Sequence, residues 1–142
     1  MNLLKDILYK VEIQSVLGST SLNINKIEFD SKKISKGDLF VAIKGFKNDG
    51  NNFINSAIDK GASVIVCQLF PKNIIKEVTY VLVQDSRKAL ALISSNFYKD
   101  PSKKLKLIGV TGTNGKTSCT TLMYNLFKKL NKKVGLISTN II

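Results

Sequence analysis

The chain has 142 residues, of which 44% are hydrophobic, and its 22 Lys and Arg against 10 Asp and Glu give a formal net charge of +12. It contains no histidine, which excludes a catalytic triad or a zinc site built on that residue. No apolar run approaches the length of about 18 residues that a membrane span needs, and the first residues mix charged with apolar side chains, unlike a signal peptide. We therefore expect a globular, cytoplasmic protein without membrane association.

The basic residues are scattered as single or paired lysines, and Arg87 is the one arginine. Nucleic-acid-binding chains more often gather such residues into a run or one face, with aromatic residues between them. We therefore expect no nucleic-acid partner, and an unrelated basic nucleic-acid-binding protein stays as an alternative. Cys67 and Cys119 match no metal or redox spacing, so both are predicted to be small core residues.

The first 100 residues alternate between helical and strand patterns. A short amphipathic helix is predicted over residues 3–11, and helical spacing returns at 53–58 and from Asp85 or Ser86, as the N-cap, to Phe97. Strands are predicted over 22–29, 39–43, 63–67 and 80–83, with turns at 36–38 and 49–50. This order predicts an N-terminal mixed α/β domain, and the Pro101–Lys104 segment marks its end.

A different unit follows this boundary. Residues 105–110 form an apolar run typical of a strand buried on both faces, and the loop Thr-Gly-Thr-Asn-Gly-Lys-Thr occupies 111–117. A helix follows, with an apolar stripe that contains Leu122, Leu126 and Leu130, and 133–138 is predicted as a second strand. Strand, glycine loop and helix in this order form the setting of a phosphate-binding loop, the P-loop.

Each residue type in the loop has a role in such chemistry. Gly112 and Gly115 let the backbone curl so that several N–H groups face one oxyanion, and the helix N-terminus adds a partial positive charge. Lys116 is predicted to reach the terminal phosphates, and the Thr117 hydroxyl is predicted to bind Mg²⁺. The alternative is an ordinary glycine turn, because Val110 stands at the first glycine position of the full P-loop pattern.

We predict two domains, residues 1–101 and 102–142. A parallel sheet with strands apolar on both faces needs helices on each side and further strands. The second domain is therefore expected to be an incomplete first strand–loop–helix–strand unit of a parallel-sheet nucleotide-binding domain, in a chain truncated relative to its working form.

Two stretches resemble the Mur ligase family. The first, FDSKKISKGDLFVAIKGFKNDGNNFINSAIDKGASVIV, is similar to the N-terminal domain shared by the ligases that add the third residue and the terminal dipeptide of the peptidoglycan stem. The second, FYKDPSKKLKLIGVTGTNGKTS, is similar to the third-residue branch, the MurE ligases. Within the family pattern, Val110 is the expected residue. The resemblance implies a UDP-MurNAc-binding domain over 1–101 and the start of the central ATP-binding domain over 102–142.

The resemblance also implies site residues. Ser31 would contact the UDP-sugar and Phe29 would line the same site, while Phe46, Lys47 and Asn48 would contact the uridine end. Phe46 departs from the polar residue that the family often has there. Two structural alternatives are that Ser31 caps the turn after Asp30 and that Phe29 is a core residue. The ATP loop would comprise Gly112, Thr113, Asn114, Gly115, Lys116, Thr117 and Ser118, with Lys116 and Thr117 catalytic and Thr117 also the metal ligand.

The activity that the resemblance implies is an ATP- and Mg²⁺-dependent ligation. A diamino acid, expected to be meso-diaminopimelate rather than lysine, would be joined to UDP-MurNAc-L-Ala-D-Glu (the UDP-MurNAc-dipeptide) through an acyl phosphate, by a monomeric protein. Alternatives are the dipeptide-adding Mur ligase and a UDP-sugar- or nucleotide-binding fragment without catalysis. The family's further metal ligands and its Asp-Asn-Pro motif are not in the sequence, so the chain alone is expected to be inactive.

Overall fold

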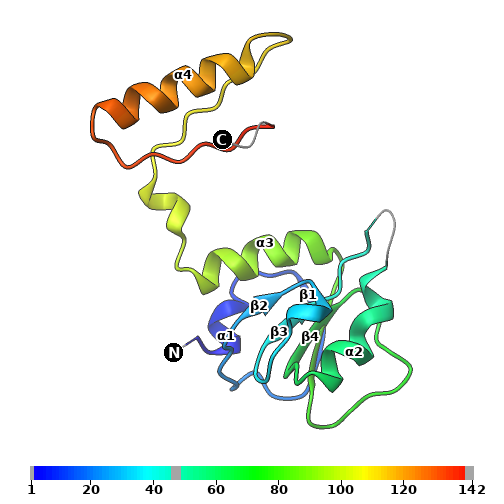
Figure 1. The fold of residues 1–142 in the computed structure, drawn as a ribbon. Helices are drawn as coiled ribbons and strands as arrows, with labels where there is room; N and C mark the ends of the chain where they lie inside the picture. Colours follow the sequence, from blue (N-terminus) through cyan, green and yellow to red (C-terminus); the bar gives the residue numbers. More distant parts are fainter. Residues whose placement is uncertain (1, 46–48, 140–142) are drawn as a thin grey trace. The chain divides into compact units, whose positions relative to one another are not determined.

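The computed structural model describes residues 2–45 and 49–139, and the chain divides into two compact units, Met1–Lys104 (unit 1) and Leu105–Ile142 (unit 2). Figure 1 shows the elements of both units. The division falls at the end of the 3₁₀ helix η3 (Pro101–Lys104). The functions that the resemblance implies for the two parts stay predictions.

Unit 1 is built on a five-stranded sheet with the strand order β1-β5-β4-β3-β2. The strands from β2 to β5 are parallel to their neighbours, whereas β1 lies antiparallel to β5 at one edge, where Ile13 pairs with Val83. Their bounds are β1 Ile13–Leu17, β2 Ile27–Glu28, β3 Leu39–Val41, β4 Val64–Cys67 and β5 Thr79–Val83. The predicted mixed α/β fold is confirmed.

Helices cover both faces of this sheet, so unit 1 has three layers (Figure 1). Residues of α1 and α3 belong to the core cluster on one face, and residues of α2 belong to the cluster on the other. The helices are α1 Leu4–Ile7, α2 Ile54–Asp59 and α3 Ser86–Phe97, with the short 3₁₀ helices η1 Ser31–Lys33 and η2 Gly50–Phe53 between strands and helices. Layers on both sides explain why the central strands are apolar on both faces.

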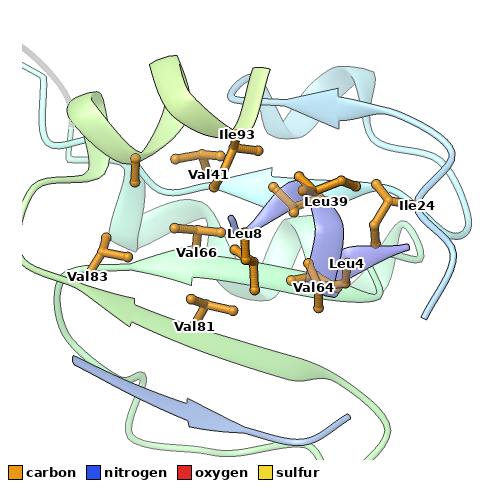
Figure 2. Packing of buried hydrophobic residues seen from close by; sticks show 12 residues of the cluster. Leu4, Leu8, Ile24, Leu39, Val41, Val64, Val66, Val81, Val83 and Ile93 are labelled. Carbon is orange, nitrogen blue, oxygen red and sulfur yellow. The ribbon is translucent and has the colours of Figure 1, made fainter. Parts of the chain in front are cut away.

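Strand β4 shows how the core is divided. Val64 and Val66 pack in the cluster that contains α1 and α3, as Figure 2 shows, whereas Ile65 and Cys67 pack in the cluster that contains α2. All four side chains are 0% exposed. Successive side chains of a strand point to opposite faces, so a strand between two helical layers needs apolar residues at every position.

Polar side chains connect the elements of unit 1. The Asn96 amide on α3 donates to the carbonyls of Ile7 (2.8 Å) and Tyr9 (2.7 Å), which ties α3 to the end of α1. The Asp85 carboxylate caps α3 by accepting from the backbone N–H of Arg87 (2.9 Å) and Lys88 (3.1 Å). Asp85, rather than Ser86, is therefore the N-cap.

Three predictions for unit 1 differ from the structure. The first helix covers Leu4–Ile7 rather than residues 3–11, and the predicted strand over 22–29 is reduced to Ile27–Glu28. Strand β1 was not predicted, because its side chains are exposed or half-buried and so lack an apolar alternation. β1 is an edge strand with little buried surface, so it forms because of its hydrogen bonds to β5 and not because of an alternation of apolar and polar residues.

In unit 2 the helix is confirmed and the two strands are not. Helix α4 spans Lys116–Lys129, but residues 105–110 and 133–138 form no strand, and no strand within 2–45 and 49–139 pairs with them. A β-strand exists only through hydrogen bonds to a neighbouring strand. The exposed fractions of Leu107 (93%) and Ile137 (100%) agree with this.

The apolar stripe of α4 is exposed as well. The exposed fractions are 70% for Leu122, 55% for Leu126 and 56% for Leu130. Cys119, on the same helix, is also exposed, so the prediction of a core residue is wrong there, while Cys67 is buried as predicted. Amphipathic spacing specifies a helix with an apolar face, but other elements must pack against that face to bury it.

No helix in the described part of the chain is long and apolar enough to cross a membrane.

Candidate functional site

The loop before α4 bends at two glycines. Gly115 is the N-cap of α4 in the left-handed conformation (φ 76°), and Gly112 has a φ of 149°. A Cβ atom at Gly115 would meet nothing within 4 Å, so the backbone angle rather than crowding favours glycine there. The chain thereby turns directly into the helix, whose first N–H groups have no partners within the helix.

Lys116 lies over this loop. Its ammonium group donates to the carbonyl of Gly112 and to that of Thr113 (3.2 Å). The ammonium therefore places a positive charge at the loop, and the first N–H groups of α4, which follow the loop, carry a partial positive charge. Loop, ammonium and helix end together favour an anion such as a phosphate group.

The first turn of α4 holds two of the three hydroxyl residues of the predicted loop 112–118, Thr117 and Ser118. The Thr120 hydroxyl donates to the carbonyls of Lys116 and Thr117, both at 3.0 Å, which fixes that turn. Thr117 is half-buried and Ser118 is exposed. A threonine hydroxyl next to a phosphate site suits Mg²⁺, which prefers oxygen ligands and keeps several waters. Within 2–45 and 49–139, no group of three or more Cys, Asp or Glu could hold a metal ion.

The predicted substrate residues of unit 1 follow strand β2. The Phe29 side chain is 64% exposed, so the alternative that it is a core residue is wrong. An exposed aromatic ring at the carboxyl end of a parallel strand is well placed to contact a ligand. Ser31 begins η1 and is 8% exposed.

The turn around Ser31 is capped by its neighbour. The Asp30 carboxylate accepts from the backbone N–H of Lys32 (2.9 Å), and the Asp30 carbonyl accepts from the N–H of Lys33 (3.0 Å). The Lys60 ammonium donates to the Ser31 carbonyl (3.0 Å). The cap of η1 therefore comes from Asp30, and Lys60 connects the Ser31 backbone to the end of α2.

Phe46, Lys47 and Asn48 lie outside the described residues. The residues on either side of them are held in place: Lys44 and Asp49 form a β-bridge, and the N–H of Gly50 donates to the carbonyl of Ile43 (2.9 Å). A Cβ atom at Gly50 would lie 2.5 Å from the Ile43 nitrogen, so only glycine fits there. Asp49–Gly50, predicted as a turn, therefore also closes the base of this segment.

A cavity in unit 1 was missed by the sequence reasoning. Its volume is about 420 Å³, and it lies beyond the ends of β3, β4 and β5. Its lining residues come from the strand ends, from the start of α3 and from the residue before β1: Lys44, Gln68, Gln84, Asp85, Arg87, Lys88 and Glu12. The available signal was that polar residues directly follow two predicted parallel strands, whose carboxyl ends meet at one edge of the sheet.

Arg87 has a role that the sequence did not predict. It is an exposed residue at the start of α3, and its guanidinium donates to the carbonyl of Lys44 (3.2 Å). This bond joins α3 to the segment after β3.

The predicted sites thus lie one in each unit: Phe29 and Ser31 in unit 1, and residues 112–118 in unit 2. Comparison with known proteins gives the family. A sequence profile described as "Mur ligase family, catalytic domain" matches residues 23–98. The chain belongs to the Mur ligase family. The match covers β2 to α3, a range that includes Phe29, Ser31 and all the cavity-lining residues except Glu12.

Curated members of this family match nearly the whole chain. A protein of Cytophaga hutchinsonii named UDP-N-acetylmuramoyl-L-alanyl-D-glutamate--2,6-diaminopimelate ligase is 50% identical over 96% of this chain. A protein of the same name from Phocaeicola vulgatus is 44% identical over 96%. The chain spans 28% of the length of these relatives.

Solved Mur ligases share the fold. MurF ligase from Thermotoga maritima, in complex with ADP, matches with a TM-score of 0.56 and 32% identity, over 74% of this chain and 23% of that one. A structure of a UDP-N-acetylmuramoyl-L-alanyl-D-glutamate--2,6-diaminopimelate ligase matches with a TM-score of 0.66 and 19% identity, over 93% of this chain and 26% of that one. The second likeness concerns the fold alone.

Proposed function

We propose that this chain is the part of a MurE-type ligase that binds UDP-MurNAc-L-Ala-D-Glu and supplies the ATP phosphate loop. The observation that carries the proposal is the 50% identity, over 96% of this chain, to a protein named as the diaminopimelate-adding ligase. The geometry of the loop in unit 2 supports the ATP part, since Lys116 and the start of α4 place positive charge around it. The exposed ring of Phe29 and the fixed backbone of Ser31 support the sugar-nucleotide part.

The proposed reaction is an amide ligation. ATP, with Mg²⁺, supplies the phosphoryl group that activates the substrate carboxylate as an acyl phosphate, and the amine of meso-diaminopimelate then displaces phosphate. Lys116 would offset the negative charge on the phosphate oxygens, and the Thr117 hydroxyl would bind Mg²⁺. Gly112, Thr113, Asn114 and Gly115 would bring backbone N–H groups to the phosphates, and Ser118 would add a hydroxyl at the first turn of α4.

The diamino acid is meso-diaminopimelate, which is supported by relatives whose names give 2,6-diaminopimelate as the amino acid added by those proteins. The protein is a cytoplasmic monomer that needs neither nucleic acid nor a membrane, and its role lies in cell-wall synthesis and thereby in cell shape and division. Residues 46–48 stay assigned to the uridine end of the substrate.

A binding module without catalysis is the second candidate. Unit 2 exposes the apolar side chains of Leu105, Leu107 and Ile108, of the α4 stripe and of Ile137. Uncovered apolar surface of this kind favours a loosely held ATP unit in a chain whose UDP-sugar domain is well packed. In that case the chain binds the UDP-MurNAc-dipeptide but not ATP.

Calorimetric titration of the 142-residue chain separates these possibilities. We expect the UDP-MurNAc-dipeptide to bind, and Ser31→Ala and Phe29→Ala to weaken that binding without changing the binding of MgATP. UDP-MurNAc-tripeptide, the substrate of the dipeptide-adding branch, should bind more weakly. Tighter binding of the tripeptide would assign the chain to that branch instead.

Lys116→Ala tests the ATP loop. Loss of one charged donor should weaken MgATP binding about tenfold or more, and in the complete enzyme it should cost about 3 kcal/mol of transition-state stabilisation. Lys129→Ala, at the opposite end of α4, removes the same charge and is the matched control. If both variants bind MgATP like the unchanged chain, or if the unchanged chain does not bind it, the loop is not an ATP site in this chain.

A further inference from the structure

Among the described residues, those that the resemblance assigns to substrate in unit 1, Phe29 and Ser31, do not line the cavity, although its Lys44 lies two positions before the assigned residues 46–48. Phe29 and Ser31 follow β2, whereas the cavity is lined by residues that follow β3, β4 and β5. Its volume of about 420 Å³ falls within the range of small-molecule sites. In open sheets of parallel strands, ligands bind at the carboxyl ends of the strands, which is where this cavity lies.

Gln68, one of the lining residues of the cavity, is held in place by two hydrogen bonds. Its amide nitrogen donates to the carbonyl of Gln84 (2.8 Å), and its amide oxygen accepts from the hydroxyl of Ser86 (3.1 Å). Ser86 is 1% exposed. Both ends of the Gln68 side chain are therefore fixed, and the ends of β4 and β5 are joined to the start of α3.

The charged groups of the cavity favour an anion. Lys44, Arg87 and Lys88 carry three positive charges, against the carboxylates of Glu12 and Asp85. The Asp85 carboxylate is engaged by the backbone of α3, where it accepts from the N–H groups of Arg87 and Lys88. The Asp85 carboxylate keeps its charge and also interacts with Arg87 and Lys88, so the three cations face two carboxylates and the lining has a net charge of +1.

The cations are also well placed for a ligand. The guanidinium of Arg87 is positioned by its bond to the Lys44 carbonyl, and its five donors in a planar fork match the oxygens of a phosphate group. The ammonium groups of Lys44 and Lys88 form no hydrogen bond or ion pair with any residue that the structure describes. An ammonium without a partner in a polar cavity gains from a phosphate oxygen, because the pair is a charge-assisted hydrogen bond.

We propose that this cavity is a phosphate-binding site, in which Lys44, Arg87 and Lys88 hold the phosphate or diphosphate group of a small molecule. The site does not depend on the proposed ligase activity. Two sources supply this chemistry, the diphosphate of a UDP-sugar and a separate phosphate compound, and the experiment below distinguishes them.

The test is a titration of the 142-residue chain with inorganic pyrophosphate, followed by NMR of the backbone amides. All variants carry Lys116→Ala, which removes the ammonium of the other phosphate loop. We expect pyrophosphate to shift the amide signals of Gln84 and Lys88. The double substitution Lys44→Gln/Lys88→Gln should weaken pyrophosphate binding about tenfold or more.

The matched control is Lys72→Gln/Lys76→Gln, which removes two charges from exposed lysines of the same unit. It should leave the affinity within about twofold, since exposed charges at a distance are screened by salt. Equal weakening by both pairs would show that only net charge attracts the anion and would overturn the proposal. Absence of any shift at Gln84 and Lys88 would overturn it as well.

A parallel titration with the UDP-MurNAc-dipeptide identifies the source of the phosphate. If Lys44→Gln/Lys88→Gln weakens binding of both compounds, the site holds the diphosphate of the sugar nucleotide. If it weakens only pyrophosphate binding, the site serves a separate phosphate compound. A chain that binds pyrophosphate here but never the UDP-sugar refutes the proposed function and leaves this site standing.

Discussion

Strand β4 and residues 105–110 have the same kind of sequence and opposite environments. Each is a short apolar run rich in branched side chains, yet the β4 side chains are 0% exposed while Leu107 is 93% and Ile108 54% exposed. Strand β4 has parallel neighbours on both sides and a helical layer on each face. An apolar run therefore specifies a tendency to be buried, and the surrounding elements decide whether a strand forms.

Glycines differ between the units in the same way. In unit 1, a Cβ atom at Gly61 (φ 101°) would lie 2.9 Å from the Lys36 Cα, so packing and backbone angle both require glycine. In unit 2, Gly115 has a positive φ but open space around it. At Gly61, both the neighbouring atoms and the backbone angle require glycine, whereas at Gly115 the backbone angle alone favours it.

Thiol labelling should give the largest contrast between the units. Cys67 is 0% exposed, and burial raises the pKa of its thiol to about 11, whereas Cys119 is exposed. At pH 8 we expect a maleimide to react with Cys119 at once and with Cys67 at least about 1,000-fold more slowly, because Cys67 must wait for unit 1 to open. Mass spectrometry of timed samples measures both rates.

The control for this experiment is the same labelling in denaturant, where the two rates should become similar. Rapid labelling of Cys67 under native conditions would mean that unit 1 is no better packed than unit 2, and the comparison would fail.

Truncation of one isoleucine in each unit should lower the free energy of unfolding by amounts that differ by a few kcal/mol. Ile93 is 0% exposed in the core of unit 1, so Ile93→Ala should lower the free energy of unfolding by about 2–5 kcal/mol. Ile137 is 100% exposed, and Ile137→Ala should change it by less than about 0.5 kcal/mol. Urea denaturation of both variants gives the two values. A large cost at Ile137 would show that its side chain is covered in solution.

Alanine at three glycines tests the glycine contrast with smaller effects. Gly61→Ala should destabilise unit 1 by about 1–3 kcal/mol, because it adds a tight contact to a strained backbone angle. Gly115→Ala should cost about 1 kcal/mol at the start of α4, from the backbone angle alone. Circular dichroism during urea denaturation measures both. Gly109→Ala, with open space and no positive φ, is the control and should be nearly neutral.

A change of pH should give the smallest effect, confined to unit 1. The backbone N–H of Lys88, followed by that of Arg87, lowers the pKa of the Asp85 carboxyl. The stability that this carboxylate contributes is therefore present above the unfolded pKa of about 4 and is lost as pH falls through the lower folded value. Asp85→Asn should reduce the difference in urea midpoint between pH 7 and pH 3. Asp100, whose pKa is lowered chiefly by Lys103, supplies a remaining share. An unchanged difference would exclude a role for the Asp85 charge.

The sequence predicted those features of unit 1 that depend on local chemistry or on complete burial. Strand β4 was predicted from its apolar run, and the cap at Asp85 from its position before a helical pattern. Strand β1 was missed because its side chains are largely outside the core, and its pairing with β5 joins distant parts of the chain. The cavity was missed for the same reason, since its residues meet only after the sheet has formed.

In unit 2, the sequence predicted the glycine bend and α4, which depend on residues next to one another. The strands over 105–110 and 133–138 were predicted wrongly, because a strand depends on partners that no local pattern reveals. The contacts of Phe29, Ser31 and the loop with substrates stay predictions. The local geometry of Ser31 and of the loop depends on residues next to them in the sequence, because Asp30 caps the turn that begins at Ser31 and Gly115 caps α4.

The sheet order β1-β5-β4-β3-β2 has a consequence for how unit 1 is made. Strand β1 is the first to leave the ribosome, and its partner β5 is the last of the five strands to do so. At about 5–20 residues per second, β1 waits several seconds for β5, and closing so long a loop is slow. The edge of the sheet therefore completes last, so newly made chains should pass through a stage in which the parallel strands have paired and β5 has an open edge.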